Sequence, residues 1–182
     1  MRFTEDDCKV LNKIVENTTI DELLEEANIQ AGYIARILSK GNRQHGISAG
    51  SRRIAGDIAV NLGIIYILMG AAAKDMRTED TVDIFADGSV ESADTGNVYD
   101  IDDMLHNLIG STMGLQVYRE ENGREFLKQY VDDLDKGFRD AARMLMDQLL
   151  EIIDKVLGIK KKDYEEMIRK KIQKFKERVF FN

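Results

Sequence analysis

The sequence lacks proline and tryptophan entirely, and its 182 residues include one cysteine and two histidines. Without proline, no helix interior loses an amide donor, which favours a mainly helical chain. Cys8 alone cannot form an intramolecular disulfide, and one thiol with two histidines gives no zinc-type cluster. No glycine-rich phosphate loop follows a predicted strand. We therefore expect no metal and no cofactor.

Targeting signals are also missing from the first residues, because "MRFTEDDCKV" carries acids where a signal peptide needs basic and then apolar residues. The nearest approach to a membrane span is 54–73, "IAGDIAVNLGIIYILMGAAA". Asp57 and Asn61 lie inside it, and its glycines and alanines make it only mildly apolar. We expect a buried helix or helix pair, no membrane span, and a cytoplasmic protein.

Charge is unevenly distributed along the chain, although the net value is −7. Residues 1–70 carry a net charge of −1, residues 71–154 of −12 and residues 155–182 of +6. The overall acidity argues against non-specific coating of nucleic acid, because attraction to phosphate dominates that kind of binding. A locally placed DNA-reading helix stays compatible with it. The basic end could contact phosphates or the acidic middle region, and a solvated helix face explains the same pattern.

The first third of the chain has the periodicity of several short helices. Thr4 or Glu5 can open the first, and residues 17–19 interrupt it. Thr19 then caps a second helix, with Glu22 at the third following position, as in a capping box. Asn28 tolerates the left-handed conformation of a tight corner, so we predict a corner there and a further helix over 30–40. A loop over 41–50 and a helix that starts at Ser48 or Ser51 and ends near Gly63 follow.

The remainder combines a predicted hairpin with three predicted helices. "TVDIFADGSVES", residues 81–92, places Asp87-Gly88 between two short β-branched and aromatic runs. Residues 100–113 then form a short helix, 114–123 a connector and 124–157 one long helix, whose apolar residues recur in steps of three and four. A final helix over 162–181 has apolar residues on one side and basic residues on the other.

The segment "LLEEANIQAGYIARILSKG", residues 23–41, resembles the helix-turn-helix of the lambda-repressor-like (Xre/Cro) superfamily. The similarity continues through "GNRQHGISAGSRRIAGDIAVNLGI" and covers about residues 5–64. It implies a mainly α fold with an N-terminal helix-turn-helix domain of four to five short helices over 1–73. Residues 74–182 would form a C-terminal helical region with a small β-hairpin.

This resemblance implies a sequence-specific transcriptional regulator that reads the major groove of double-stranded DNA with helix 30–39. Glutamine can pair with adenine and arginine with guanine, whereas phosphate contacts fix only the register. The implied DNA-binding residues are Gln30, Ala31, Gly32, Tyr33, Arg36, Ser39, Lys40, Asn42 and Arg43. Because helix-turn-helix proteins generally bind two half-sites, we also expect a homodimer through helix 124–157. That helix could instead pack within its own chain.

The alternative function is a non-enzymatic protein-protein interaction module that uses the same helices without DNA. Such a module needs the same buried apolar residues as a DNA-binding domain. The two functions therefore differ only in the side chains on the exposed face of the helices. Enzyme function is not expected. Asp94-Thr95-Gly96 matches the aspartic protease triplet but has an ordinary turn composition, and His106 with Asp102 and Asp103 suits a solvated helix start.

Overall fold

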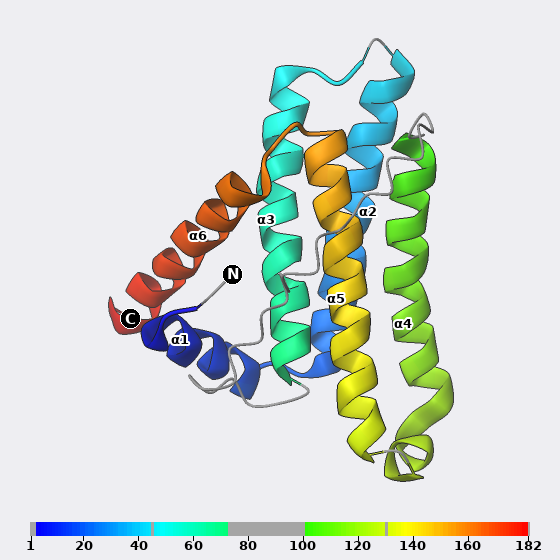
Figure 1. Ribbon diagram of the computed structural model, residues 1–182, viewed down its shortest axis with the longest axis vertical. Coiled ribbons are helices and arrows are strands. Elements are labelled where there is room, and N and C mark those ends of the chain that lie inside the picture. The colour runs from blue at the N-terminus through cyan, green and yellow to red at the C-terminus, as the bar shows by residue number, and fades with distance from the viewer. Residues whose placement is uncertain (1–2, 45, 73–100, 130, 182) are drawn as a thin grey trace.

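The computed structural model describes residues 3–44, 46–72, 101–129 and 131–181, with side chains over 3–19, 21–41, 46–70, 101–116 and 141–175. These residues form six helices and no strand, so the mainly α class is confirmed (Figure 1). The hairpin predicted over 81–92 and the Asp94-Thr95-Gly96 turn lie outside the described residues. The helices are α1 (Glu5–Glu16), α2 (Ile20–Gln44), α3 (Ala49–Ala72), α4 (Ile101–Gln129), α5 (Val131–Lys155) and α6 (Lys161–Phe181).

Four of these helices form a bundle. α2 packs on α3 and α4, and α5 packs on the same two helices, so the four follow one another around a common core. α1 and α6 lie outside the bundle against α3 and contact each other. Figure 1 shows α6 diverging from α3 toward α1, so that these three helices enclose a triangle. One hydrophobic core joins buried residues from the helices on both sides of the predicted boundary at residue 73.

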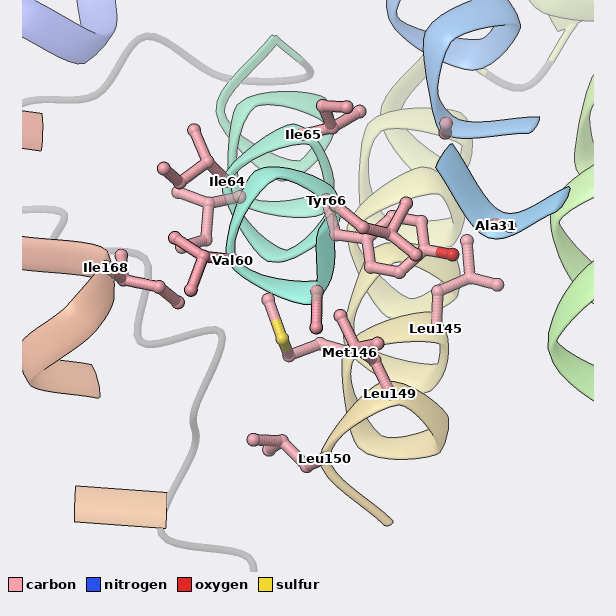
Figure 2. Packing of buried hydrophobic residues seen from close by; sticks show 14 of the residues in the cluster. Ala31, Val60, Ile64, Ile65, Tyr66, Leu145, Met146, Leu149, Leu150 and Ile168 are labelled. Carbon is pink, nitrogen blue, oxygen red and sulfur yellow. The ribbon is translucent and has the colours of Figure 1, made fainter. Parts of the chain in front are cut away.

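The central helix is α3, whose sequence is apolar nearly all round. Every described side chain over 62–70 is buried. Figure 2 shows Tyr66 on the side of α3 turned toward Leu145 and Ala31, with Val60 and Ile64 on the side turned toward Ile168 of α6. An apolar helix segment must be covered by other parts of the protein, and the neighbouring helices provide that cover over 62–70.

By length and composition, α3 is also the one helix among the described residues that could cross a membrane, over Ala49–Gly70. Its most apolar window is 72% buried within the protein. The core helix of a soluble protein passes the same test.

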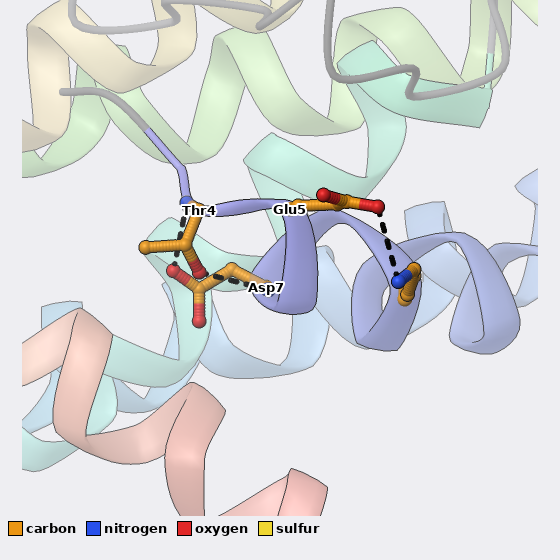
Figure 3. A network of polar contacts seen from close by, with 4 residues as sticks. Thr4, Glu5 and Asp7 are labelled. Atoms are coloured by element: carbon orange, nitrogen blue, oxygen red, sulfur yellow. Dashed lines mark hydrogen bonds and ion pairs between the residues drawn. The ribbon is translucent and has the colours of Figure 1, made fainter.

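Side-chain caps define the helix starts as local sequence rules predict. At α1, the Thr4 amide donates to Asp7 Oδ2 and the Asp7 amide donates to Thr4 Oγ1, both at 3.1 Å (Figure 3). At α2, the Thr19 amide donates to Glu22 Oε2 at 2.9 Å and the Glu22 amide to Thr19 Oγ1 at 3.2 Å. The predicted capping box is therefore confirmed. Ser48, one of the two predicted caps of α3, accepts from the Ser51 amide at 3.1 Å.

The corner predicted at Asn28 is wrong, because α2 runs unbroken from Ile20 to Gln44. No non-glycine residue in the described part of the chain has a positive φ. The side-chain amide of Asn28 donates from Nδ2 to the Leu24 carbonyl at 3.1 Å and to Gln116 Oε1 on α4. Asparagine permits a corner but does not impose one, and here its amide joins two helices. The described residues of 1–73 therefore lack the helix break on which the expected helix-turn-helix depended.

Other predicted boundaries also need correction. α3 continues to Ala72 instead of ending near Gly63, and the connector predicted over 114–123 lies inside α4. The single helix predicted over 124–157 is divided between the end of α4 and α5, which run antiparallel in Figure 1. A glycine costs a helix only about 1 kcal/mol relative to alanine, which tertiary packing readily outweighs. The final helix, predicted over 162–181, is confirmed as α6.

A layer of polar contacts connects the bundle helices at the level of residues 111–116 of α4. The hydroxyls of Tyr66 and Thr112 are 2.8 Å apart, and Thr112 also donates to the Leu108 carbonyl at 2.8 Å. Gln148 of α5 donates to Ser111 at 3.2 Å. Buried polar groups are costly unless they are paired, so these contacts favour one register of α4 against its neighbours.

The contact between α3 and α6 depends on Gly63. The buried Tyr164 hydroxyl donates to the Ala59 carbonyl at 2.5 Å. A Cβ atom added at Gly63 would overlap that same hydroxyl, and it would also lie 3.3 Å from Ile168 Cδ1. The missing side chain at Gly63 is therefore what lets the Tyr164 ring lie against α3.

We predict that Gly63→Ala lowers the free energy of unfolding by about 1–3 kcal/mol, the usual cost of overpacking, despite the better helix propensity of alanine. Urea unfolding measures the change. In a Tyr164→Phe background, which lacks the overlapping oxygen, the same substitution should cost less. A Gly63→Ala variant at least as stable as wild type would contradict this account of the helix contact.

The burial of two tyrosines also makes the free energy of unfolding depend on pH in the alkaline range. It raises the pKa of Tyr66 well above the usual 10, against the opposing effect of the Thr112 hydrogen bond, and it raises the pKa of Tyr164 as well. Below pH about 10 both hydroxyls are neutral in the folded and unfolded chain, so they add no pH dependence. Above it the unfolded chain loses these protons first, and stability falls by about 1.4 kcal/mol per pH unit for each tyrosine.

We therefore predict a steep loss of stability above pH about 10 that flattens in the Tyr66→Phe/Tyr164→Phe variant. Urea unfolding between pH 8 and 11 measures how the free energy of unfolding changes with pH in the wild type and in the variant. The two proteins should show the same pH dependence between pH 8 and 9. An identical alkaline slope in the two proteins would show that these hydroxyls are not responsible.

Candidate binding groove

The nine residues implied for DNA reading occupy different surroundings along α2. Ala31 is 1% exposed and belongs to the core, whereas Tyr33 is 52% exposed. Arg36 and Lys40 are exposed, and Gly32 and Ser39 are half-buried. Gln30 points toward α1, α3 and α6, where it lines a pocket. The side chains of Asn42 and Arg43 lie outside the described residues.

Among the implied residues whose side chains the structure describes, Tyr33, Arg36 and Lys40 are the exposed ones on the outer face of α2. Glu22, Glu25 and Glu26 are exposed on the preceding turns of the same helix. A buried Ala31 cannot contact a base in this structure, and a helix without a corner presents no separate reading helix. DNA binding stays a prediction from sequence, without the geometry on which it depended.

A groove lies between α3 and α6 and has two sections. The first has a volume of about 380 Å³ and is lined by polar and basic side chains together with two apolar ones: Asp57, Val60 and Asn61 of α3 and Met167, Lys170, Lys171 and Lys174 of α6. Its lining residues recur at three- and four-residue spacing on both helices, so each helix contributes one continuous edge.

The second section has a volume of about 370 Å³ and is mainly apolar. Its lining is Ile14 of α1, Glu26 and Gln30 of α2, Asn61, Ile64, Ile65 and Leu68 of α3, and Phe175 of α6. Asn61 lines both sections, and we call the two sections together the α3–α6 groove. Along α3 it extends from Asp57 to Leu68, or about 16 Å at the rise of an α-helix.

The charges along the groove are partly compensated. Lys170 Nζ lies 3.3 Å from Glu166 Oε1 in an exposed pair one turn apart. Lys171 Nζ lies 5.7 Å from the centre of the Phe175 ring, so a cation covers one side of the apolar section. Glu26 Oε1 accepts from Gln30 at 2.8 Å. Three lysines and two acids line the groove, and Glu166 beside Lys170 brings the acids to three, so the formal charges balance.

The groove lining consists of carboxylates, side-chain amides, lysines and apolar side chains. It contains no cysteine, histidine or serine that could act as a nucleophile or a neutral base. In the part of the chain that the structure describes, no three His, Cys, Asp or Glu residues lie close enough to hold a metal ion. Cys8 is buried, and this burial, with Asp7 and Glu5 nearby, raises the pKa of its thiol. A raised pKa keeps the less reactive protonated form.

Comparisons with known proteins add no identification: no protein-family model, no curated protein and no solved structure matches this chain. The resemblance to the Xre/Cro superfamily therefore stays an interpretation of residues 5–64. The homodimer through 124–157 also stays a prediction, since the side chains of 124–140, half of that range, lie outside the described residues.

Sequence reasoning missed the groove, although two signals pointed to it. Asp57 and Asn61 interrupt the apolar run of α3 one turn apart, and both lie on the groove edge. The basic residues of the last helix were interpreted as a solvated face or a phosphate contact. Three of these lysines line the groove. Their spacing along α6 could not indicate this, because it does not say which helix lies opposite them.

Proposed function

We propose that this chain is a non-enzymatic protein-binding module, whose α3–α6 groove holds a segment of a partner protein. The observation that carries the proposal is the joining of an apolar section and a basic section at Asn61. Amphipathic helices bind other proteins by laying an apolar face into a groove of this kind. This was the alternative function predicted from the sequence.

Two features favour protein binding over the regulator predicted first. The DNA-reading interpretation needed a separate helix after Asn28, and α2 continues through that residue. Acidic residues also precede Tyr33, Arg36 and Lys40 on the exposed face of α2, which weakens attraction to phosphate. The groove, by contrast, combines four helices from both halves of the chain.

The junction of the two sections allows a direct test. Asn61→Trp would fill the groove where its sections meet, and we predict that it weakens partner binding by about tenfold or more, because the partner's apolar side chains lose their site. Gln173→Trp, at an exposed position of α6 outside the groove lining, is the matched control and should bind normally. Circular dichroism and urea unfolding establish that both variants are folded.

Partner binding can be detected by a photo-crosslinking amino acid placed at Asp57 in the full-length chain within its native cells. We expect a defined protein adduct that disappears in the Asn61→Trp background and persists with Gln173→Trp. If the same adduct forms with equal yield in both backgrounds, or if none forms at Asp57, the groove is not a protein-binding site.

A further inference from the structure

The outer face of α2 carries a continuous stripe of exposed side chains, opposite the residues that this helix buries in the core. Its six members recur in alternating steps of four and three residues, over about 27 Å of the helix: Glu22, Glu26, Ile29, Tyr33, Arg36 and Lys40. Alternating steps of four and three are the spacing with which one helix packs along another in a coiled coil. The stripe therefore has the pattern of a helix-packing surface, although it lies on the outside of the bundle.

We propose that this stripe is a homodimer interface, on which α2 of a second copy of the chain lies antiparallel, with the two-fold axis at the level of Ala31. The inference does not depend on the function proposed for the α3–α6 groove. It also places the dimer contact on a different surface from the helix over 124–157 that the sequence predicted for this role.

The centre of the stripe is formed by two large apolar side chains. Ile29 is 42% exposed and Tyr33 is 52% exposed, and the two lie one turn apart. They are equidistant from Ala31, so an antiparallel pair of helices places Ile29 of each copy opposite Tyr33 of the other. Both side chains are accessible in the single chain. Contact with a second copy would therefore remove apolar surface from water.

The charges on the two sides of this centre have opposite signs. The acids precede it and the bases follow it along the stripe: Glu22 and Glu26, then Arg36 and Lys40. Within one chain, Glu26 and Arg36 are about 15 Å apart along the helix, which is too far for an ion pair. They are equidistant from Ala31, so antiparallel packing places Glu26 of one copy opposite Arg36 of the other. Glu22 and Lys40 meet in the same way. The stripe is thus complementary to itself, as an isologous contact requires.

The acidic half of the stripe keeps its charge in the single chain. Glu22 Oε2 accepts from the Thr19 amide at 2.9 Å, and Glu26 Oε1 accepts from the Gln30 side chain at 2.8 Å. Neither donor carries a charge, so both carboxylates still attract cations. A parallel helix pair would bring like charges together, and a DNA duplex would meet repulsion from these acids. The antiparallel second copy satisfies both halves of the stripe.

Sedimentation equilibrium of the full-length protein, from micromolar to millimolar concentrations, tests the proposal. One helix from each copy forms a contact at the small end of specific interfaces, so we expect a weak dimer that dissociates on dilution. Arg36→Glu places acids opposite each other at both ends of the contact and should raise the dissociation constant by about tenfold or more. Lys162→Glu makes the same charge change at an exposed position of α6 and should leave the dissociation constant unchanged.

Exchanging the charges distinguishes pairing across the axis from a general effect of charge. Glu26→Arg/Arg36→Glu restores complementarity within one chain, so its dissociation constant should return to within about threefold of the wild type. An equimolar mixture of the Glu26→Arg and Arg36→Glu proteins should form a mixed dimer more tightly than either protein pairs with itself. Circular dichroism and urea unfolding establish that every variant is folded.

Cysteine crosslinking tests the antiparallel register. In a Cys8→Ala background, a Glu26→Cys chain mixed with an Arg36→Cys chain should form a disulfide between the two chains under mild oxidation. Two Glu26→Cys chains should not, because their substituted positions lie about 15 Å apart along an antiparallel pair. Preferential crosslinking between two Glu26→Cys chains would contradict this register.

Four outcomes would overturn the inference. These are a protein that stays monomeric at millimolar concentration, a dimer unaffected by Arg36→Glu, and a weakened dimer that Glu26→Arg does not restore. The fourth is duplex DNA or another protein that displaces the second copy and requires Arg36, which would assign the stripe to that partner. The crosslinked adduct at Asp57 should persist with Arg36→Glu, so the dimer and the groove function can fail separately.

Discussion

The burial of α3 is the constraint on which the rest of the structure depends. A 24-residue helix with apolar side chains nearly all round is unstable in water unless other helices cover it. α2 and α5 cover it within the bundle, and α1 and α6 cover the side turned outward. Two residues of α3 contribute to this packing. Gly63 leaves room for the Tyr164 ring, and the Tyr66 hydroxyl forms a hydrogen bond with Thr112 of α4.

The groove exists because this cover is incomplete along one edge. α6 diverges from α3 on its way to α1 (Figure 1), and the polar residues Asp57 and Asn61 of α3 line the pocket between the two helices. Asp57 is exposed and Asn61 half-buried there, while Ile64, Ile65 and Leu68, which line the second section, are buried. One helix thus supplies both the core of the fold and the wall of the proposed binding site.

Local rules predicted those features of the fold that local interactions decide. The Thr19–Glu22 capping box, the helix start at Thr4 and the basic last helix could all be inferred, because each depends on residues within one or two turns. Asn28 could not, since its amide binds Gln116, 88 positions away. The groove was beyond prediction for the same reason: its lining comes from four helices, and only the fold brings Lys170 near Asp57.

Cysteine accessibility along α3 tests the central claim most directly. In a Cys8→Ala background, single cysteines at Asp57 and Asn61 should react rapidly with a polar maleimide in the purified protein. Cysteines at Ala55, Ala59 and Leu62, whose wild-type side chains are at most 1% exposed, should react only as fast as the protein unfolds. Rapid labelling at Ala59 and Leu62, or protection at Asp57 and Asn61, would contradict a core helix with one open edge.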